Sequence, residues 1–197
     1  MNVHPSGLLR DTRGVSAVEF AFVGPILIML LLGGLQLSYD IWMKAMVNGA
    51  VQQAGRDSGL EMAHASQTAI DDEVKEQIHR MLPSAEVSFE RKNYQTFSDV
   101  NRPEVFIDAN KNGIYDNKEC FDDENGNSLW DADAGALGQG GARDVVVYRV
   151  TVAYDELVPL SRFVGLDPKR RFTAVTTLMN QPFATQADRP VRQICPK

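Results

Sequence analysis

The chain of 197 residues is 44% hydrophobic and 23% charged, and it carries a formal net charge of −6. This length can bury the core of one modest domain. The acidic balance excludes a basic nucleic-acid-binding surface, so no nucleic-acid partner is expected.

The most informative stretch is the apolar run from Val15 to about Leu37, in which Glu19 is the single ionisable residue. At roughly 1.5 Å of rise per residue, about 20 helical residues span the roughly 30 Å hydrocarbon core of a bilayer. The run is longer than the apolar part of a signal peptide, and no Ala-x-Ala site closes it. Arg10 and Arg13 precede it, so the positive-inside rule predicts a single-pass helix with everything after it outside the cytoplasm.

Glu19 stands five residues after Gly14, at the head of this apolar run. The sequence RGVSAVEFA, from Arg13 to Ala21, followed by Gly24-Pro25, resembles the TadE-like pseudopilins (minor pilins) of the tight-adherence (Tad) type IV pilus system. The resemblance covers about residues 10–60. It implies a prepilin-type leader at 1–14, removed by prepilin peptidase after Gly14, and a mature chain that begins at Val15.

The resemblance also gives Glu19 a partner. The new α-amino group of Val15, in the same subunit or in a neighbour, would neutralise a carboxylate buried in the membrane, where neither charge is tolerated alone. A glutamate that reaches back to the water interface is the alternative. The position of Gly14 favours the pairing and implies assembly with other pilin subunits through the N-terminal helix.

The helical pattern continues to about residue 60. Apolar or small side chains recur at spacings of three and four at Leu35, Tyr39, Trp42, Met46, Ala50 and Ala54. Tyr39 and Trp42 are placed for an aromatic belt at the outer interface. The sequence leaves open whether this face packs on the chain's own head domain or on neighbouring subunits.

The head domain, 61–197, is predicted to be α+β, with a small antiparallel sheet packed on helix. A second helix is expected from Ala63 to Met81, ended by Pro83 and Ser84. Period-two alternation predicts strands at Val87–Arg91, Asp144–Tyr154 and Arg171–Met179. Residues Glu156–Lys169 are expected to form a loop with a short helical turn.

An insertion at about 105–135 carries the second motif. Residues 108–119, DANKNGIYDNKE, match the EF-hand loop pattern D-x-[DN]-x-[DN]-G-x₅-E at every specified position. Calcium takes six to eight hard oxygens, which short acidic and amide side chains supply from alternate positions. The predicted ligands are Asp108, Asn110, Asn112, the carbonyl of Ile114, Asp116 and Glu119.

A partial copy follows fifteen residues later, in which Asp123, Asn125, Asn127, Leu129 and Asp131 align with ligands of the first loop. Ser128 replaces the turn glycine, and Ala134 stands where the first loop has its glutamate. The second site is therefore expected only if Asp133 or Asp122 completes it. The tandem resembles the short calcium repeats of dockerins and thrombospondin type 3 segments, and its spacing is too short for a paired EF-hand domain.

A polar, turn-rich loop would also contain many Asp, Asn and Gly residues. However, the stretch from Val105 to Gly135 has eight acidic and two basic residues, which equals the net charge of −6 of the whole chain. Such a loop repels itself without a cation. We therefore expect Ca²⁺ in the first loop and a second Ca²⁺ if the partial copy is completed, with affinities of roughly 10⁻⁴–10⁻³ M or somewhat tighter.

The chain has two cysteines, Cys120 and Cys195. In an oxidising compartment an even count favours a disulfide, which would tie the C-terminal tail to the edge of the first calcium loop. Two free thiols are the alternative.

No catalytic motif is present: the sequence has no Gly-x-Ser-x-Gly, no His-Glu-x-x-His and no phosphate-binding loop. His64 and His79 lack partners at metal-site spacing and are interpreted as surface residues. We expect a non-enzymatic minor pilin in the inner membrane, with a periplasmic head, that contributes to a surface pilus. The alternative is a single-pass membrane-anchored, calcium-dependent binding or adhesion module without a filament role.

Overall fold

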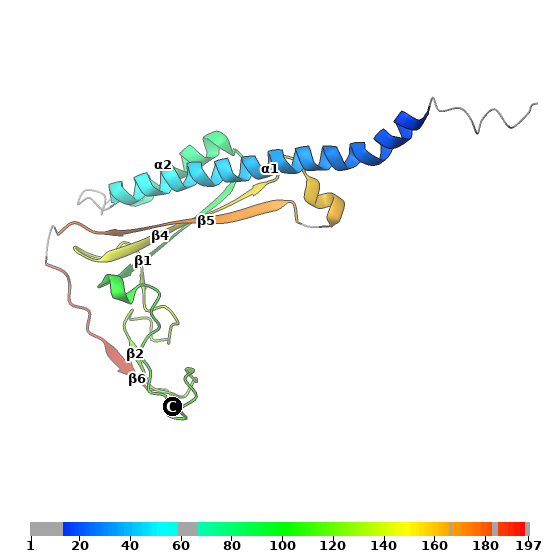
Figure 1. The fold of residues 1–197 in the computed structure, drawn as a ribbon. Helices are drawn as coiled ribbons and strands as arrows, with labels where there is room; N and C mark the ends of the chain where they lie inside the picture. Colours follow the sequence, from blue (N-terminus) through cyan, green and yellow to red (C-terminus); the bar gives the residue numbers. More distant parts are fainter. Residues whose placement is uncertain (1–13, 59–66, 166, 183–184, 196–197) are drawn as a thin grey trace, which may run out of the picture. The chain divides into compact units, whose positions relative to one another are not determined.

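The computed structural model describes residues 14–58, 67–165, 167–182 and 185–195. They form two compact units. The first contains the described residues up to Met43 together with Glu156–Pro168, and the second contains Lys44–Asp155 and the chain from Lys169 onward. Helix α1, Val15–Ser58, runs through the boundary between them (Figure 1).

In the first unit, α1 has the character of a membrane helix. It is the one described helix that is long and apolar enough to cross a bilayer. Its large side chains stay exposed, with Phe20 at 68%, Phe22 at 74% and Leu30 at 69%. Such surface is stabilised by an apolar environment, and the length and composition of the helix suit the predicted single-pass membrane anchor.

The loop Glu156–Pro168 joins the first unit through one buried side chain of α1. Gln36 is 4% exposed; its Nε2 donates to Asp40 at 2.9 Å, and its Oε1 accepts the N–H of Val158 at 3.0 Å. The helical turn expected in this loop is η4, Leu160–Val164. Ser161 donates its N–H and hydroxyl to the Glu156 carboxylate, which ties the turn back to the start of the loop.

The second unit is built on a four-stranded antiparallel sheet of order β3-β1-β4-β5. The strands are β1 Glu86–Tyr94, β3 Ala136–Leu137, β4 Val145–Asp155 and β5 Lys169–Met179. In the register of the three long strands, Phe89 lies opposite Val150, which lies opposite Ala174. The predicted antiparallel head is therefore confirmed; β1 and β5 are longer than expected, and β4 is shifted by one residue.

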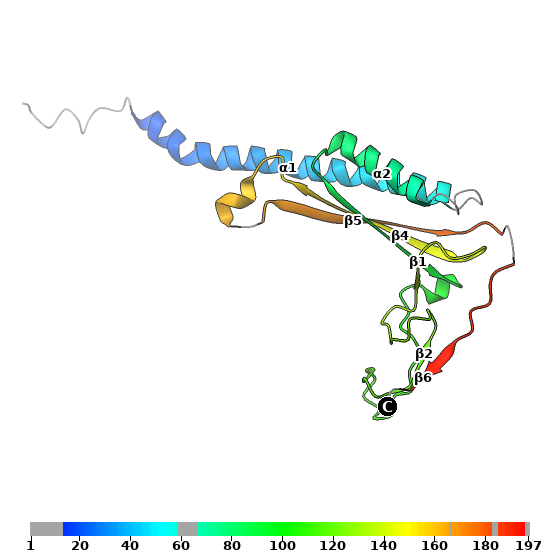
Figure 2. The ribbon, with the colours of Figure 1, turned by 180° about the vertical axis from the view of Figure 1, so that it is seen from behind.

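One face of this sheet is covered by helices (Figure 2). These are α1 from Lys44 onward and α2, Gln67–Met81. Burial along β4 alternates less strictly than predicted, because Val145, Val147 and Ala153 on its second face are also buried. The side chains of the first face, Val146, Tyr148, Val150 and Val152, are all fully buried. Against them the helices bury Val47, Val51, Val74 and Ile78. The helices, with a period of 3.6 residues, and the strand, with a period of two residues, thus both contribute apolar side chains to this core.

The apolar face predicted for the extended part of α1 is largely not the packed one. Leu35, Trp42 and Met46 remain 43–52% exposed. The buried apolar side chains of this part are Met43, Val47, Val51 and Ala54. Apolar residues stand on more than one side of the helix here, so spacing alone does not identify the buried side.

Helix α2 is fixed to the sheet by a buried charged group. Arg91 donates two hydrogen bonds to Asp71, at 2.7 and 2.6 Å, and its guanidinium lies 4.2 Å from the centre of the Tyr148 ring. The Tyr148 hydroxyl donates to the same carboxylate at 2.6 Å. Burial and this hydrogen bond raise the pKa of Tyr148. His79, expected at the surface, is half-buried at the end of α2, and its Nε2 lies 3.0 Å from the carbonyl of Ala85.

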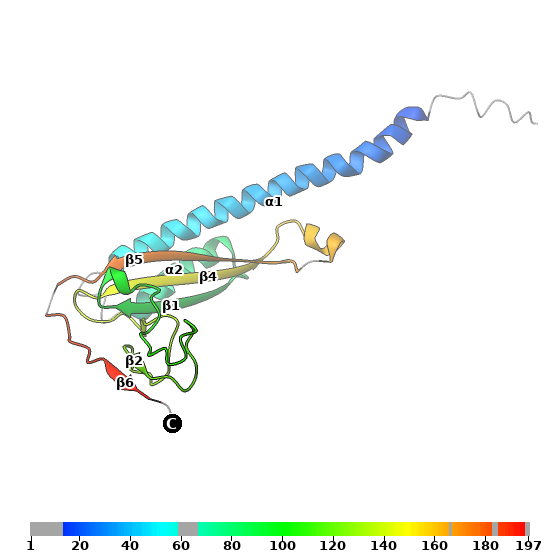
Figure 3. The same ribbon diagram turned by 60° about the horizontal axis from the view of Figure 1, so that its bottom comes forward.

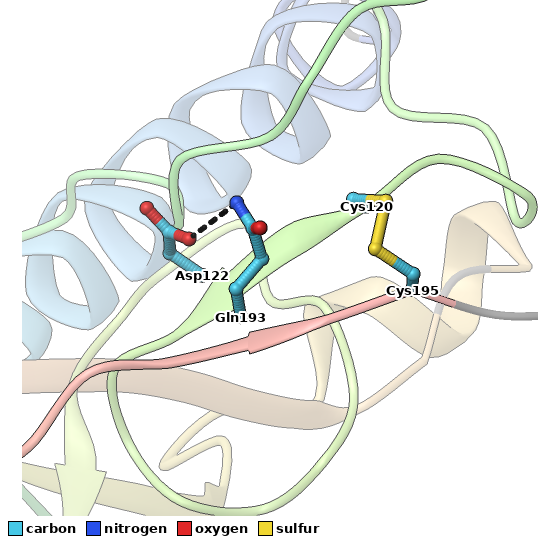
Figure 4. The surroundings of a disulfide bond; sticks show 4 residues. All are labelled: Cys120, Asp122, Gln193 and Cys195. Carbon is cyan, nitrogen blue, oxygen red and sulfur yellow. Dashed lines mark hydrogen bonds between the residues drawn. A yellow bond between two sulfur atoms is a disulfide. The ribbon is translucent and has the colours of Figure 1, made fainter.

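The insertion lies against the sheet face that the helices leave free (Figure 3). It contains β2, Phe121–Asp123, which pairs with β6, Arg192–Ile194, in a two-stranded antiparallel ladder. The disulfide between Cys120 and Cys195 sits beside this ladder (Figure 4). The predicted disulfide is therefore present, whereas β2, β3 and β6 were not predicted from the sequence.

The C-terminal segment is also held at Asp144, which is 2% exposed. Its carboxylate accepts hydrogen bonds from the Gln186 amide and the Arg189 guanidinium. A buried carboxylate needs such donors because burial otherwise penalises the charge. The segment before β6 is thus attached to the start of β4.

Candidate functional site

The start of α1 is the first site to consider. Helix α1 begins at Val15, and Gly14 caps it by accepting the N–H of Val18 at 3.2 Å. Gly14 is exposed, and a Cβ added there would meet nothing within 4 Å. Glu19 is exposed one turn after Val15. The rest of the predicted leader, including Arg13, lies outside the described residues.

The first loop of the insertion has the backbone of an EF-hand-like turn. Asp108 accepts the N–H groups of Asn112 at 3.1 Å and of Gly113 at 2.7 Å. Gly113 has φ +75°, a left-handed conformation that glycine adopts without strain. Asp116 accepts the side-chain amides of Asn110 at 2.6 Å and Asn112 at 3.0 Å. Four of the six predicted ligand residues, Asp108, Asn110, Asn112 and Asp116, therefore belong to one network of side-chain and backbone hydrogen bonds.

Glu119 closes this first loop. One carboxylate oxygen accepts the N–H of Ala109 at 2.8 Å, and the other accepts the N–H of Asp116 at 3.1 Å. Glu119 is 6% exposed, whereas Ile114 in the same loop is 68% exposed. The glutamate thus bridges the second and ninth positions of the loop from its buried side.

The second loop repeats the first in detail. Asp123 accepts the N–H groups of Asn127 and Ser128, both at 3.1 Å. Asp131 accepts the side-chain amides of Asn125 at 2.8 Å and Asn127 at 2.6 Å. Ser128 has φ +66°, so the serine keeps the left-handed turn that glycine makes in the first loop. Leu129, 67% exposed, occupies the place of Ile114. The serine in place of the turn glycine therefore leaves the backbone conformation of the turn unchanged.

The two residues expected to complete the second loop, Asp133 and Asp122, have hydrogen-bond partners outside that loop. The Asp133 carboxylate accepts hydrogen bonds from Lys92 at 2.8 Å and from the Tyr94 hydroxyl at 2.9 Å. Asp122 accepts a 3.4 Å hydrogen bond from Gln193, on the strand that pairs with β2 (Figure 4). Both carboxylates instead fix the insertion to its surroundings, Asp133 to β1 and Asp122 to β6.

The closing position of the second loop is taken by Glu104, which the sequence analysis missed. Its carboxylate accepts the N–H of Glu124 at 2.9 Å and the N–H of Asp131 at 3.0 Å. These are the second and ninth positions of the second loop, as Ala109 and Asp116 are in the first. The sequence does contain a signal for Glu104, because the fifteen-residue repeat begins before the first loop. In this longer repeat Glu104 aligns with Glu119, and Phe106 aligns with Phe121.

The environment of these carboxylates differs within the insertion. Burial raises the pKa of Glu104, against the opposing effect of its backbone hydrogen bonds. Burial also disfavours the charge of Asp133, but the hydrogen bonds from Lys92 and Tyr94 prevail and lower its pKa. Burial and the same contact raise the pKa of Tyr94 to about 12. Asp133 is therefore a structural anion with its own cationic partner, unlike Glu104.

The fit of the insertion to a cation depends on amide and backbone oxygens. Over the described residues, no three acidic, histidine or cysteine side chains converge to hold a metal ion. The EF-hand pattern takes part of its shell from asparagine side chains and from the carbonyl at the seventh position. In this chain those positions are Asn110 and Ile114 in the first loop, and Asn125 and Leu129 in the second. The donor set is chemically suited to Ca²⁺, which prefers hard oxygens.

Residues 14–56 match the family model described as TadE-like protein. The N-terminal segment of this chain is therefore TadE-like, as the motif around Gly14 and Glu19 predicted. The match ends within α1 and does not include the sheet or the insertion. No curated protein and no solved structure matches the chain.

Proposed function

We propose that this chain is a minor pilin or pseudopilin of a tight-adherence type IV pilus, processed after Gly14 and stabilised by calcium in its head. The observation that carries the proposal is a coincidence within the TadE-like segment. An exposed glycine directly precedes the first residue of the apolar helix, and Glu19 follows one turn later. A simple membrane anchor requires neither residue.

Cleavage after Gly14 would leave a positive α-amino group on Val15. Residues four apart lie on the same side of a helix, so this ammonium group and the Glu19 carboxylate are neighbours within one subunit. The pair is also available between adjacent subunits. In a low-dielectric assembly an ion pair avoids the cost of burying either charge alone. The glutamate would thus control the register of subunits in the inner membrane.

The surface of α1 supports packing against other pilin subunits. Leu35, Trp42 and Met46 are at least 43% exposed, beyond the positions that the helix buries against its own chain. Their exposure supports the proposal that this face contacts lipid or neighbouring subunits. The partners proposed are other pilins and a prepilin peptidase, and the head would be periplasmic.

The N-terminus of the mature protein tests the proposal. Mature protein isolated from cells is expected to begin at Val15, and Gly14→Glu is expected to block processing because it denies the peptidase its small residue. Gly7→Glu, at the other glycine of the leader, is the matched control and should be processed. Assembled protein that keeps Met1 in the presence of its peptidase would contradict the pilin proposal and leave the membrane-anchored binding module.

The role of Glu19 has a separate test. Glu19→Val makes the helix more apolar and should leave membrane insertion intact. It is expected to reduce recovery of the chain with its partner pilins. Equal assembly by this variant would show that the glutamate only reaches the interface.

The calcium part of the proposal is tested with the full chain in detergent micelles. A ligand that binds only the folded state stabilises it by mass action, and at a Kd of roughly 10⁻⁴–10⁻³ M ten millimolar Ca²⁺ contributes about 1.4–2.7 kcal/mol. Millimolar Ca²⁺ should therefore raise the melting temperature and protect residues 105–135 from proteolysis. Mg²⁺ should substitute poorly because it demands a tighter octahedral shell. No shift at ten millimolar Ca²⁺ would remove calcium from the proposal.

A further inference from the structure

The two loops of the insertion form an internal pair with approximate two-fold symmetry. Phe106 and Phe121, which are fifteen residues apart and equivalent in the repeat, face each other across an antiparallel bridge. The backbone hydrogen bonds around them are reciprocal. Ile107 donates to the carbonyl of Cys120 at 2.8 Å, and its equivalent Asp122 donates to the carbonyl of Val105 at 2.8 Å.

A shared aromatic core supports this pairing. Tyr115 and Trp130, again equivalent in the repeat, are stacked with ring centres 4.5 Å apart and planes inclined by 13°. Phe106 meets the edge of Trp130 at 6.1 Å, and Phe121 meets Tyr115 in the same way at 5.7 Å. Four aromatic rings, two from each repeat, thus hold the loops together without flanking helices in the described part of the insertion.

The glutamates complete the symmetry. Glu119, the first residue of the second repeat, closes the first loop, and Glu104, the first residue of the first repeat, closes the second loop. The backbone hydrogen bonds have the same symmetry. The N–H of Glu119 donates to the carbonyl of Asp116 at 2.8 Å, and the N–H of Glu104 donates to the carbonyl of Asp131 at 3.0 Å. Each loop is closed by the glutamate that begins the opposite repeat.

Among the described residues, no lysine or arginine pairs with the buried carboxylates of the two loops. Glu104, Glu119 and Asp123 are 1%, 6% and 2% exposed. In the part of the chain that the structure describes, their carboxylates accept backbone N–H groups, and none of them forms an ion pair with lysine or arginine. Three buried carboxylates in one small module carry a large desolvation cost unless a cation compensates them.

We propose that the insertion is a two-site Ca²⁺ module with exchanged closing ligands, in which Glu104 supplies the acidic ligand of the second loop as Glu119 does for the first. The proposal rests on the calcium part of the proposed function. It replaces the weak second site expected from the sequence with a complete one. It also assigns to the second loop a ligand that lies nineteen residues before Asp123, outside the EF-hand pattern.

The test is calorimetric titration of the full chain in detergent micelles with CaCl₂. Wild-type protein is expected to bind two ions. Glu104→Gln and Glu119→Gln should each weaken one site by tenfold or more, because ligand charge tunes the affinity of such loops over several decades. The double variant should lose both sites. Glu90→Gln, a surface glutamate of β1, is the matched control and should bind two ions as wild type does.

Folding is checked separately, by the melting temperature of each variant without calcium. If Glu104→Gln does not fold, Glu104→Asp keeps the charge, shortens the reach of the carboxylate and should still weaken one site. Two undiminished sites in a folded Glu104 variant would overturn the proposal. A wild-type protein that binds one ion, lost in Glu119→Gln alone, would also overturn it while leaving calcium binding intact. No binding by wild type would instead refute the calcium part of the proposed function.

Discussion

Removal of the disulfide between Cys120 and Cys195 is expected to destabilise the head and release its C-terminal segment. The bond joins residues 75 positions apart. On the loop-entropy model, a closed loop of this length stabilises the folded state by about 4.5 kcal/mol. Locally, the bond supports β2 and β6, which pair over only three residues each. An isolated two-stranded ladder of this size is marginal in water.

The measurement is guanidinium unfolding of the full chain in detergent micelles, for wild type and for Cys120→Ser/Cys195→Ser. With a denaturant slope of a few kcal/mol per molar, a loss of about 4 kcal/mol lowers the midpoint by roughly 1 M. Wild-type protein treated with reductant is the matched control and should behave as the double variant does. Proteolysis should cut residues 181–191 first, because the described side-chain contacts that then hold this segment are those of Gln186 and Arg189 with Gln95 and Asp144. Equal midpoints for oxidised and reduced protein would refute the reasoning.

Three further predictions concern single positions in the second unit. Gly113→Ser should destabilise the first loop by about 1–2 kcal/mol, because φ at this position is +75° and serine is strained there. Ser128→Gly, at φ +66°, should instead stabilise the second loop by up to about 1 kcal/mol. Thermal melts of both variants check this, and equal shifts of the melting temperature would contradict it. Gly49→Ala meets nothing within 4 Å and should stabilise α1 by up to about 1 kcal/mol. The same change at Gly55 brings a Cβ within 2.7 Å of Thr176 Cγ2 and should be destabilising, and a gain at both glycines would show that the helix-to-sheet contact is loose. Tyr94, with its pKa raised to about 12, holds its proton more tightly in the folded than in the unfolded state. Its contribution to stability should therefore be full below pH 10 and be lost as the pH rises toward 12, which melting temperatures of wild type and Tyr94→Phe across this range would test.

The sequence by itself determined the features that depend on neighbours along the chain. The apolar run after Gly14 predicts a membrane helix because its length alone matches a bilayer. The alternation in Asp144–Tyr154 predicts the central strand because one face of a buried sheet must be apolar. The spacing of Asp108, Asn110 and Asn112 predicts the first loop because each side chain folds back on backbone two to five residues away.

Tertiary structure decided the features that depend on contacts between distant segments. Where α1 packs on the sheet, it selected Val47 and Val51 rather than Met46 as the buried positions, which the spacing of apolar residues does not distinguish. It paired β2 with β6 across about 70 residues, although neither is long enough to be predicted as a strand. It also brought Glu104 to the second loop. The fifteen-residue repeat makes Glu104 the equivalent of Glu119, but its hydrogen bonds to Glu124 and Asp131 form only once the two repeats pack together, so the spacing within the second loop does not predict them.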